Sequence, residues 1–308
     1  MENKKIINQE KRSRKLFMFS ALVVPTLFFL VFFVYVNFDS LLMAFQRPDY
    51  SSGSLVEQFT FENFRLIFSK NSGLDEILDS IKNTLIFFFS DLIIVFPISI
   101  FMSYFFFKKM PGFRFFRFVF YLPSVISSSV LVILFKYAIG DGGIIDAIMT
   151  KQGKDFFYLL SQAPDALYTI VFYNVMFSFG VNIIVLGGSM NGVNSEVLEA
   201  GRIDGCGWRK ELFLLVIPMM WPTISTIVIL KMTGILSASG PILAFTKGGV
   251  GTMTLSYLLY ALVSGVGKSQ DLYYASAVGV VMTVVVFPIT MLVKHLVYSD
   301  KKDAEDTL

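Results

Sequence analysis

Residues 16–38 read LFMFSALVVPTLFFLVFFVYVNF, a stretch of 23 residues without a charged side chain between Lys15 and Asp39. A helix that crosses a bilayer needs about 20 mostly apolar residues. The stretch is too long for a signal peptide and lacks a small-residue cleavage site, so we interpret it as a retained membrane span. It predicts a membrane protein built from helices.

Five further apolar runs follow along the chain. They lie between Lys82 and Lys108 (interrupted only by Asp91), at 118–135, at 166–195 with the most apolar part at 167–186, at 212–230 continuing past Lys231, and at 272–293. Each run is long enough to cross a bilayer. The sequence therefore predicts an all-α protein with six transmembrane helices in one domain over 16–297, flanked by polar tails at 1–15 and 298–308.

The composition supports a membrane protein and excludes several other classes. Hydrophobic residues make up 55% of the 308 residues and charged residues 16%, whereas a soluble domain has about 25% charged residues. One cysteine (Cys206) allows no internal disulfide, and one histidine (His295) argues against a histidine metal cluster or a Ser-His-Asp triad. The chain lacks a GxxxxGK[ST] phosphate loop, and a net charge of +3 is too small to predict nucleic-acid binding. No catalytic residue and no metal ligand set is therefore expected.

Lysine and arginine residues predict the orientation of the six spans. With the N-terminus inside the cell, 16 of these residues fall on the inner side and 8 in the outer loops. Inner loops of membrane proteins carry an excess of Lys and Arg. The distribution predicts that both the N-terminus and the C-terminus lie inside.

The connection between the fourth and fifth runs is longer than a turn. Residues 196–203 have the composition of a short helix, with apolar Val197, Ala200 and Ile203 at intervals of three. Asp204-Gly205 then predicts the end of this helix. A second helix with basic residues at its inner end leads to Ile217-Pro218.

This connection resembles a motif of a known family. Residues 199–206 read EAGRIDGC, and Pro218 closes the segment. The stretch resembles the EAA loop of the membrane permease subunits of binding-protein-dependent ABC importers, whose pattern is Glu-Ala-Ala, two residues, Asp-Gly-Ala and a final Leu-Pro. Gly201, Cys206 and Ile217 depart from the pattern, and each stays small or apolar. The segment 196–218 is called the coupling loop below.

Other stretches resemble the carbohydrate-uptake branch of that family. They are Asn83-Thr84-Leu85, Tyr121 to Val125, Gly248-Gly249 followed by Thr252 to Leu255 (with Val250 in place of a proline), and Tyr274 to Ala277. The resemblance covers roughly residues 16–297. It extends over all six predicted spans.

The resemblance implies an ABC importer permease fold, in a multi-pass protein of the bacterial cell membrane that is not itself an enzyme. It implies a second, different permease subunit, two cytoplasmic ATPase subunits that hold ATP and magnesium, and an extracytoplasmic binding protein that delivers a sugar or oligosaccharide. This chain itself would bind no cofactor. Coupling to the ATPase would use the residues Glu199, Ala200, Gly201, Asp204, Gly205 and Pro218. An amphipathic helix lying on lipid headgroups is the alternative for this loop.

Polar side chains within the spans are candidates for the substrate path, because polar groups in a bilayer are costly. Asn174, Ser178 and Asn182 follow one another at intervals of four, which places them on one helix face. They would line a cavity that binds sugar hydroxyls, or they would join helices by hydrogen bonds. Lys231 lies in that cavity or extends to the surface from a span end, and Asp91 lines the cavity or pairs with a helix end.

Two alternatives remain open. An ion-coupled secondary transporter needs ionisable residues within the membrane, and here only Asp91 and Lys231 qualify. A membrane scaffold or sensor that transports nothing is the other. Both alternatives leave the coupling loop unexplained.

Overall fold

The computed structural model describes residues 14, 17–49, 56–69, 73–153 and 158–305. Most of the predicted tail 1–15 and the last three residues of the tail 298–308 lie outside these residues. The chain forms two compact units. The first comprises residues 1–72 and 271–281, and the second comprises residues 73–270 and 282–308.

The first unit contains the first predicted span and a small β-hairpin. The helical segment Phe17–Ala44 includes η1 (Phe29–Tyr35) and α2 (Val36–Ala44), and no residue of its most apolar stretch is buried within the structure. Strands β1 (Gln46–Asp49) and β2 (Val56–Phe59) pair antiparallel, with Arg47 opposite Gln58. Helix α3 (Glu62–Ile67) follows. Buried Asn63 joins these elements, because its amide donates hydrogen bonds to the carbonyls of Ala44 (3.0 Å) and Gln46 (2.9 Å).

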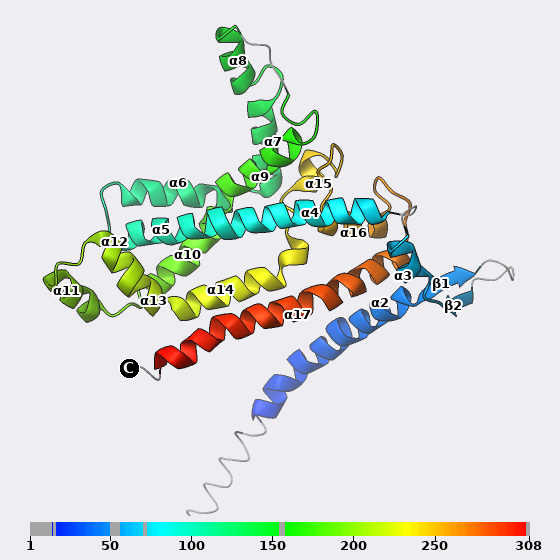
Figure 1. The fold of residues 1–308 in the computed structure, drawn as a ribbon, viewed down its shortest axis with the longest axis horizontal. Coiled ribbons are helices and arrows are strands. Elements are labelled where there is room, and N and C mark those ends of the chain that lie inside the picture. Colours follow the sequence, from blue (N-terminus) through cyan, green and yellow to red (C-terminus); the bar gives the residue numbers. More distant parts are fainter. Residues whose placement is uncertain (1–13, 15–16, 50–55, 70–72, 154–157, 306–308) are drawn as a thin grey trace, which may run out of the picture. The chain divides into compact units, whose positions relative to one another are not determined.

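The second unit is a helical bundle (Figure 1). Its first long helix, Leu74–Phe107, comprises α4 (Leu74–Ser90), a π-helical turn η2 (Asp91–Val95) and α5 (Phe96–Phe107). The fourth predicted span comprises α9 (Asp165–Phe177) and α10 (Phe179–Met190). Helix α10 packs along α5, where the Ser103 hydroxyl donates to the Ile183 carbonyl at 3.3 Å. Helix α17 (Leu272–Glu305) begins in the first unit and continues in the second, past the predicted end of the sixth run.

Two predicted spans are sharply bent. The third run crosses the break between α6 (Phe113–Val125) and α7 (Ser128–Ile139), and α6 makes an angle of 106° with the segment Ser128–Lys151, which ends in α8 (Ile144–Lys151). Pro123 lies inside α6 and lacks the N–H that would continue the helix. Among the described residues, four helices are long and apolar enough to cross a membrane, and six result if each bent pair is one span.

The second bend lies in the fifth predicted span. The segment Trp208–Met219 comprises α12 (Trp208–Lys210), η3 (Glu211–Val216) and α13 (Ile217–Met219). It meets α14 (Trp221–Thr233) at 71° at Met220, between Pro218 and Pro222. Three short helices follow α14 in the second unit: η4 (Ile235–Ser237), α15 (Ile242–Phe245) and α16 (Leu255–Ser264).

The long helix Leu74–Phe107 is joined to the loop before α16 by side-chain hydrogen bonds. The Asn83 amide donates to the carbonyls of Gly251 (3.0 Å) and Met253 (2.7 Å), and the Leu255 N–H donates to the Thr84 hydroxyl (2.9 Å). Asn83 and Thr84 are both buried. These two residues therefore satisfy backbone groups of a loop that would otherwise be unpaired inside the unit.

Candidate functional site

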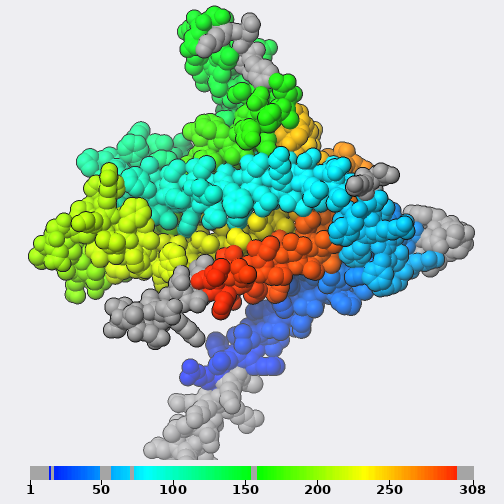
Figure 2. Space-filling view, in the orientation of Figure 1, coloured from blue at the N-terminus to red at the C-terminus, as the bar shows by residue number. Residues whose placement is uncertain are grey.

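The coupling loop contains the short helix that the sequence predicts. Helix α11 (Ser195–Ile203) begins after Asn194, whose side-chain oxygen accepts a hydrogen bond from the Glu196 N–H at 2.9 Å. This N-cap was missed, although Asn is among the preferred capping residues. Figure 2 shows the yellow-green atoms around this helix at one tip of the second unit.

The predicted end of this helix at Asp204-Gly205 is confirmed. Gly205 has φ +77°, the left-handed conformation that glycine adopts without steric cost. The Gly205 N–H donates to the Arg202 carbonyl (3.1 Å) and the Cys206 N–H to the Gly201 carbonyl (2.9 Å). These two bonds form a Schellman motif, which satisfies the last carbonyls of the helix. Helix α11 is therefore capped at both ends.

Most of the predicted coupling residues are accessible. Glu199, Ala200, Asp204, Gly205 and Pro218 are exposed, and Gly201 is half-buried.

Gly201 makes a close approach to the following helix. A Cβ atom at this position would lie 2.7 Å from Leu215 Cδ1, so this glycine brings α11 directly against η3. On the same helix, Leu198 is buried in an apolar cluster with Leu186, Met190 and Val216. The helix thus rests on the bundle through one apolar side chain and a glycine contact.

An ion-pair network that sequence reasoning missed holds the coupling loop to the first long helix. Glu211, the first residue of η3, is only 3% exposed. Its carboxylate oxygens lie 2.6 and 2.9 Å from Lys108 Nζ at the end of α5, and one of them lies 3.7 Å from Arg202 Nε on α11. A buried carboxylate requires such partners. The one signal in the sequence was an acidic residue directly after Arg209 and Lys210.

A second candidate site is a polar cavity of about 280 Å³ inside the second unit. It brings together three of the predicted path residues, Asn174, Ser178 and Lys231, and it also includes Asp91. The Lys231 ammonium forms an ion pair with the Asp91 carboxylate, and it lies 5.8 Å from the centre of the Phe96 ring. The remaining lining residues are Phe87, Phe88, Gly234, Ser237, Ala238, Ser239 and Gly240.

Asn182 is not among the residues that line this cavity. Ser178 lies between α9 and α10 with φ −92° and ψ 1°, so Asn174 and Asn182 belong to different helices. Two of the three residues that the sequence places on one helix face are joined. The Ser178 hydroxyl donates a hydrogen bond to the Asn174 side-chain oxygen at 3.2 Å.

A neighbouring cavity of about 520 Å³ shares Asn174, Ser178 and Gly240 with the polar cavity. Its wall adds the hydroxyls of Ser124 and Ser128 and the rings of Tyr173 and Phe177. Neutral donors and acceptors beside aromatic rings suit a ligand that carries hydroxyl groups on an apolar ring. Within the described residues, no group of three His, Cys, Asp or Glu side chains could hold a metal ion.

Comparisons with known proteins agree on one family. The sequence model described as "Binding-protein-dependent transport system inner membrane component" matches residues 94–299. The chain is 28% identical over 235 residues to the probable ABC transporter permease protein YesP of Bacillus subtilis (strain 168), covering 75% of this chain and 74% of that protein. It is 24% identical to the multiple sugar-binding transport system permease protein MsmF of Streptococcus mutans, covering 88% and 91%.

A solved structure has the same fold. A chain from the crystal structure of a bacterial ABC transporter involved in the import of the acidic polysaccharide alginate superposes with a TM-score of 0.79. The alignment covers 94% of this chain and 98% of the other, at 20% sequence identity.

Proposed function

Because the chain belongs to the family of inner membrane components of binding-protein-dependent transport systems, we propose that it forms half of the translocation path of an ATP-driven importer for a sugar or oligosaccharide. The observation that carries this proposal is α11, an exposed and doubly capped helix that is tied through Glu211 to a helix lining a polar cavity. The relatives named above include a sugar transport permease, which supports the same class of cargo.

The proposed coupling begins at α11. This chain has no phosphate loop of its own, so the energy has to arrive from separate ATPase subunits that bind ATP and magnesium. Glu199, Ala200, Asp204 and Gly205 present an exposed surface on which an ATPase can dock. The contact of Gly201 with Leu215 and the ion pair of Arg202 with Glu211 then transmit a displacement of α11 to η3.

From η3 the displacement reaches the polar cavity by a continuous set of contacts. Glu211 binds Lys108 at the end of α5, and α5 is continuous with α4 through η2. Asp91 is the first residue of η2 and pairs with Lys231 on α14 at the cavity wall. A π-helical turn inside a helix often marks a functional position. We place the conformational change between inward-facing and outward-facing states at this turn.

The cargo is proposed to bind along the polar cavity and its neighbour. Asn174 and Ser178 supply neutral hydrogen-bonding groups to both cavities, and Tyr173 and Phe177 supply aromatic faces to the second. Asp91 neutralises Lys231, so this half of the path offers no unpaired charge from these two residues. A second permease subunit would supply the other half, and an extracytoplasmic binding protein would deliver the sugar.

The test is reconstitution of the chain with its partner subunits in proteoliposomes. The proposal expects uptake of a sugar or oligosaccharide that requires internal ATP and the external binding protein, together with co-purification of an ATPase. Uptake that follows an ion gradient in the absence of ATP would assign the chain to secondary transporters instead.

A further inference from the structure

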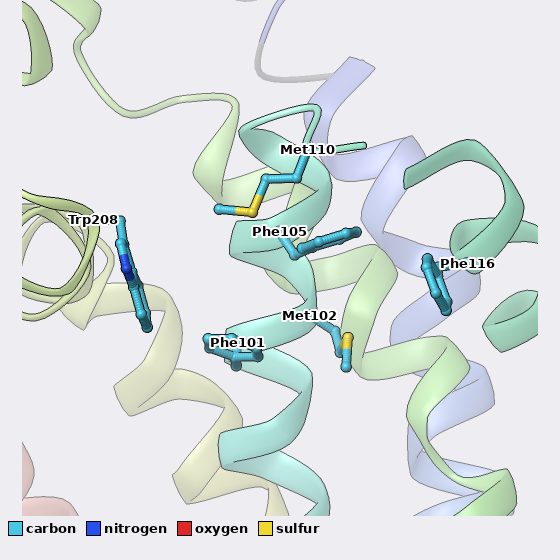
Figure 3. A pocket seen from close by; sticks show the side chains of 6 residues that line it. All are labelled: Phe101, Met102, Phe105, Met110, Phe116 and Trp208. Atoms are coloured by element: carbon cyan, nitrogen blue, oxygen red, sulfur yellow. The ribbon is translucent and has the colours of Figure 1, made fainter. Parts of the chain in front are cut away.

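An apolar groove lies at the end of the second unit that also carries the coupling loop. Figure 3 shows Phe101, Met102 and Phe105 on α5, with Trp208 of α12 on one side and Phe116 of α6 on the other. Met110 completes the wall, and the volume is about 460 Å³. The groove shares no residue with the two polar cavities.

The groove walls are fixed by aromatic contacts and remain open at the surface. The Phe101 and Trp208 rings meet edge-on at 6.1 Å, and the Phe105 and Phe116 rings do so at 5.9 Å. Yet Trp208 stays 46% exposed and Phe116 stays 44% exposed. Exposed apolar patches of this kind mark interaction sites. In an inner membrane component such a wall suits a lipid chain or another apolar protein surface.

One cationic side chain lies directly beside the groove, and three others lie on or next to the segments that form its wall. The Arg209 guanidinium lies 5.2 Å from the centre of the Trp208 ring. Lys109 directly precedes Met110, and Arg117 directly follows Phe116, with its guanidinium 5.7 Å from the Phe106 ring. Lys109, Arg114, Arg117 and Arg209 are all exposed.

Among the described residues, no carboxylate forms an ion pair with any of these four cations. The stretch 101–117, which supplies five of the six wall residues, contains no Asp or Glu. Glu211 follows Trp208 by three residues, but it is buried and engaged by Lys108 and Arg202. The groove therefore combines an apolar wall with Arg209 beside Trp208 and with three further exposed cations on the adjoining segments.

We propose that the groove binds an anionic phospholipid of the surrounding bilayer, with an acyl chain along Phe101, Met102 and Phe105 and the phosphate held by Arg209 and the neighbouring cations. Basic pockets beside membrane helices bind anionic headgroups in this way. An uncharged protein helix could pack against the apolar wall, but it would leave the cations without a counter-charge. The charge pattern therefore favours an anionic lipid. The lipid would contact Trp208 and thus the start of the coupling loop.

Photocrosslinking identifies the occupant directly. A benzophenone-bearing phenylalanine analogue is placed at Phe116 in the intact transporter complex, in nanodiscs of phosphatidylcholine and phosphatidylglycerol. The expected product is an adduct with the mass of phosphatidylglycerol, in excess over its share of the bilayer. Crosslinks to a protein subunit, or adducts that match the bulk lipid ratio, would overturn the proposal.

Lipid retention in native mass spectrometry tests the charge and the groove separately. Arg209→Gln should lower retained phosphatidylglycerol about fivefold, since one cation near a headgroup contributes about 1 kcal/mol. Met102→Trp fills the groove and keeps every charge, and it should also displace the lipid. Lys151→Gln removes an exposed cation from α8, which contributes no residue to the groove wall, and should retain lipid as the unmodified chain does. Unchanged retention in both groove variants, with the complex intact, would contradict a lipid site.

Discussion

Lys108 Nζ lies 2.6 Å from Glu211 Oε1 although 103 residues separate the two in sequence. The pair joins the C-cap of the first long helix to the first residue of η3. Since Glu211 also faces Arg202 of α11, one buried carboxylate connects three segments. In the proposed importer this carboxylate transmits a displacement of α11 to the membrane helices.

Replacement of Glu211 by glutamine should uncouple the transporter. Glu211→Gln keeps the shape of the side chain and leaves Lys108 without its counter-charge. Removing one partner of a buried pair costs about 3–5 kcal/mol, and the 18% exposure of Lys108 favours the lower end because solvent screens part of the charge. We expect lower thermal stability of the purified complex and loss of ATP-driven uptake.

Two further variants separate coupling from general damage at this position. Asp141→Asn removes an exposed carboxylate that lies outside the coupling loop and should leave uptake unchanged. The double variant Lys108→Gln with Glu211→Gln removes both charges, so that no unpaired charge stays buried. It should recover part of the thermal stability. Normal uptake and stability in Glu211→Gln alone would show that the network is not part of the coupling.

The exposed surface of α11 gives a second prediction. Glu199→Lys reverses the charge of an exposed residue on α11, and we expect it to abolish ATP-driven uptake by weakening the ATPase dock. Insertion into the membrane should be unaffected, because Glu199 is exposed on α11. ATPase co-purification and uptake measure the two effects. Full uptake in this variant would exclude this surface as the docking site.

The turn that ends α11 is tested by a matched pair of glycines. Gly205 has φ +77°, so Gly205→Ala should cost roughly 1–2 kcal/mol, and Gly205→Pro should abolish uptake because proline fixes φ near −65°. Gly207→Ala is the control, since Gly207 has φ −70° and open space around its Cβ position. Equal uptake by all three variants would contradict a role for the turn.

The predicted orientation can be tested by cysteine labelling in a Cys206→Ser background. Ser161 and Ser195 are both exposed, so each can be replaced by cysteine in turn. The lysine and arginine distribution predicts that a membrane-impermeant reagent labels Ser161→Cys in intact cells and Ser195→Cys only after the cells are opened. Labelling of position 195 in intact cells would overturn the orientation with both termini inside.

The polar cavity gives a further prediction. Asn174→Ala and Ser178→Ala should weaken or alter sugar uptake, because a site loses affinity when one hydrogen-bonding partner is removed. Asn182→Ala is the matched control, since Asn182 is only half-exposed on α10 and does not line the cavity. Uptake of a panel of neutral and acidic oligosaccharides is the measurement. If all three changes have equal effects, these side chains stabilise helix packing and do not contact the substrate.

The Asp91–Lys231 pair predicts a non-additive result within the same assay. Lys231→Met leaves Asp91 alone in the cavity wall and Asp91→Asn leaves Lys231 alone, so each single change should reduce uptake strongly. The double variant leaves neither charge and should take up neutral sugars better than either single variant. A double variant that is worse than both would mean that the charges act on the cargo separately.

Local signals in the sequence were sufficient for the coupling loop. The helix at 196–203 and its end at Asp204-Gly205 follow from residues that are near one another in the chain, and the structure confirms both. The bend after Val125 was not predictable in the same way. The run 118–135 carries no charge. Pro123 and the four serines within it signal a break, but hydropathy does not give the direction in which the chain continues.

The contacts that organise the two sites could not be predicted from the sequence, for a different reason. Glu211 with Lys108 and Asp91 with Lys231 are pairs separated by 103 and 140 residues. Considered alone, Lys108 and Glu211 have the pattern of ordinary surface charges, and Asp91 and Lys231 were predicted to lie within spans but not to form a pair. Their burial and pairing depend on how α5, η3 and α14 pack, and no local pattern encodes that packing. The same holds for Asn83, whose amide binds backbone carbonyls 168 and 170 residues away.

The length of the helix Leu74–Phe107 has a consequence for the choice of membrane. Its 34 residues extend about 50 Å at 1.5 Å per residue, whereas a bilayer with its headgroups is about 40–45 Å thick. The start of the helix can protrude from the bilayer, since it carries Asp75, Glu76 and Asp79. Tilt of the helix must absorb the rest of the difference between its length and the bilayer thickness. A thinner bilayer would tilt this helix further and swing Lys108 relative to α11. Transport should therefore vary with acyl-chain length, even among lipids of identical headgroup.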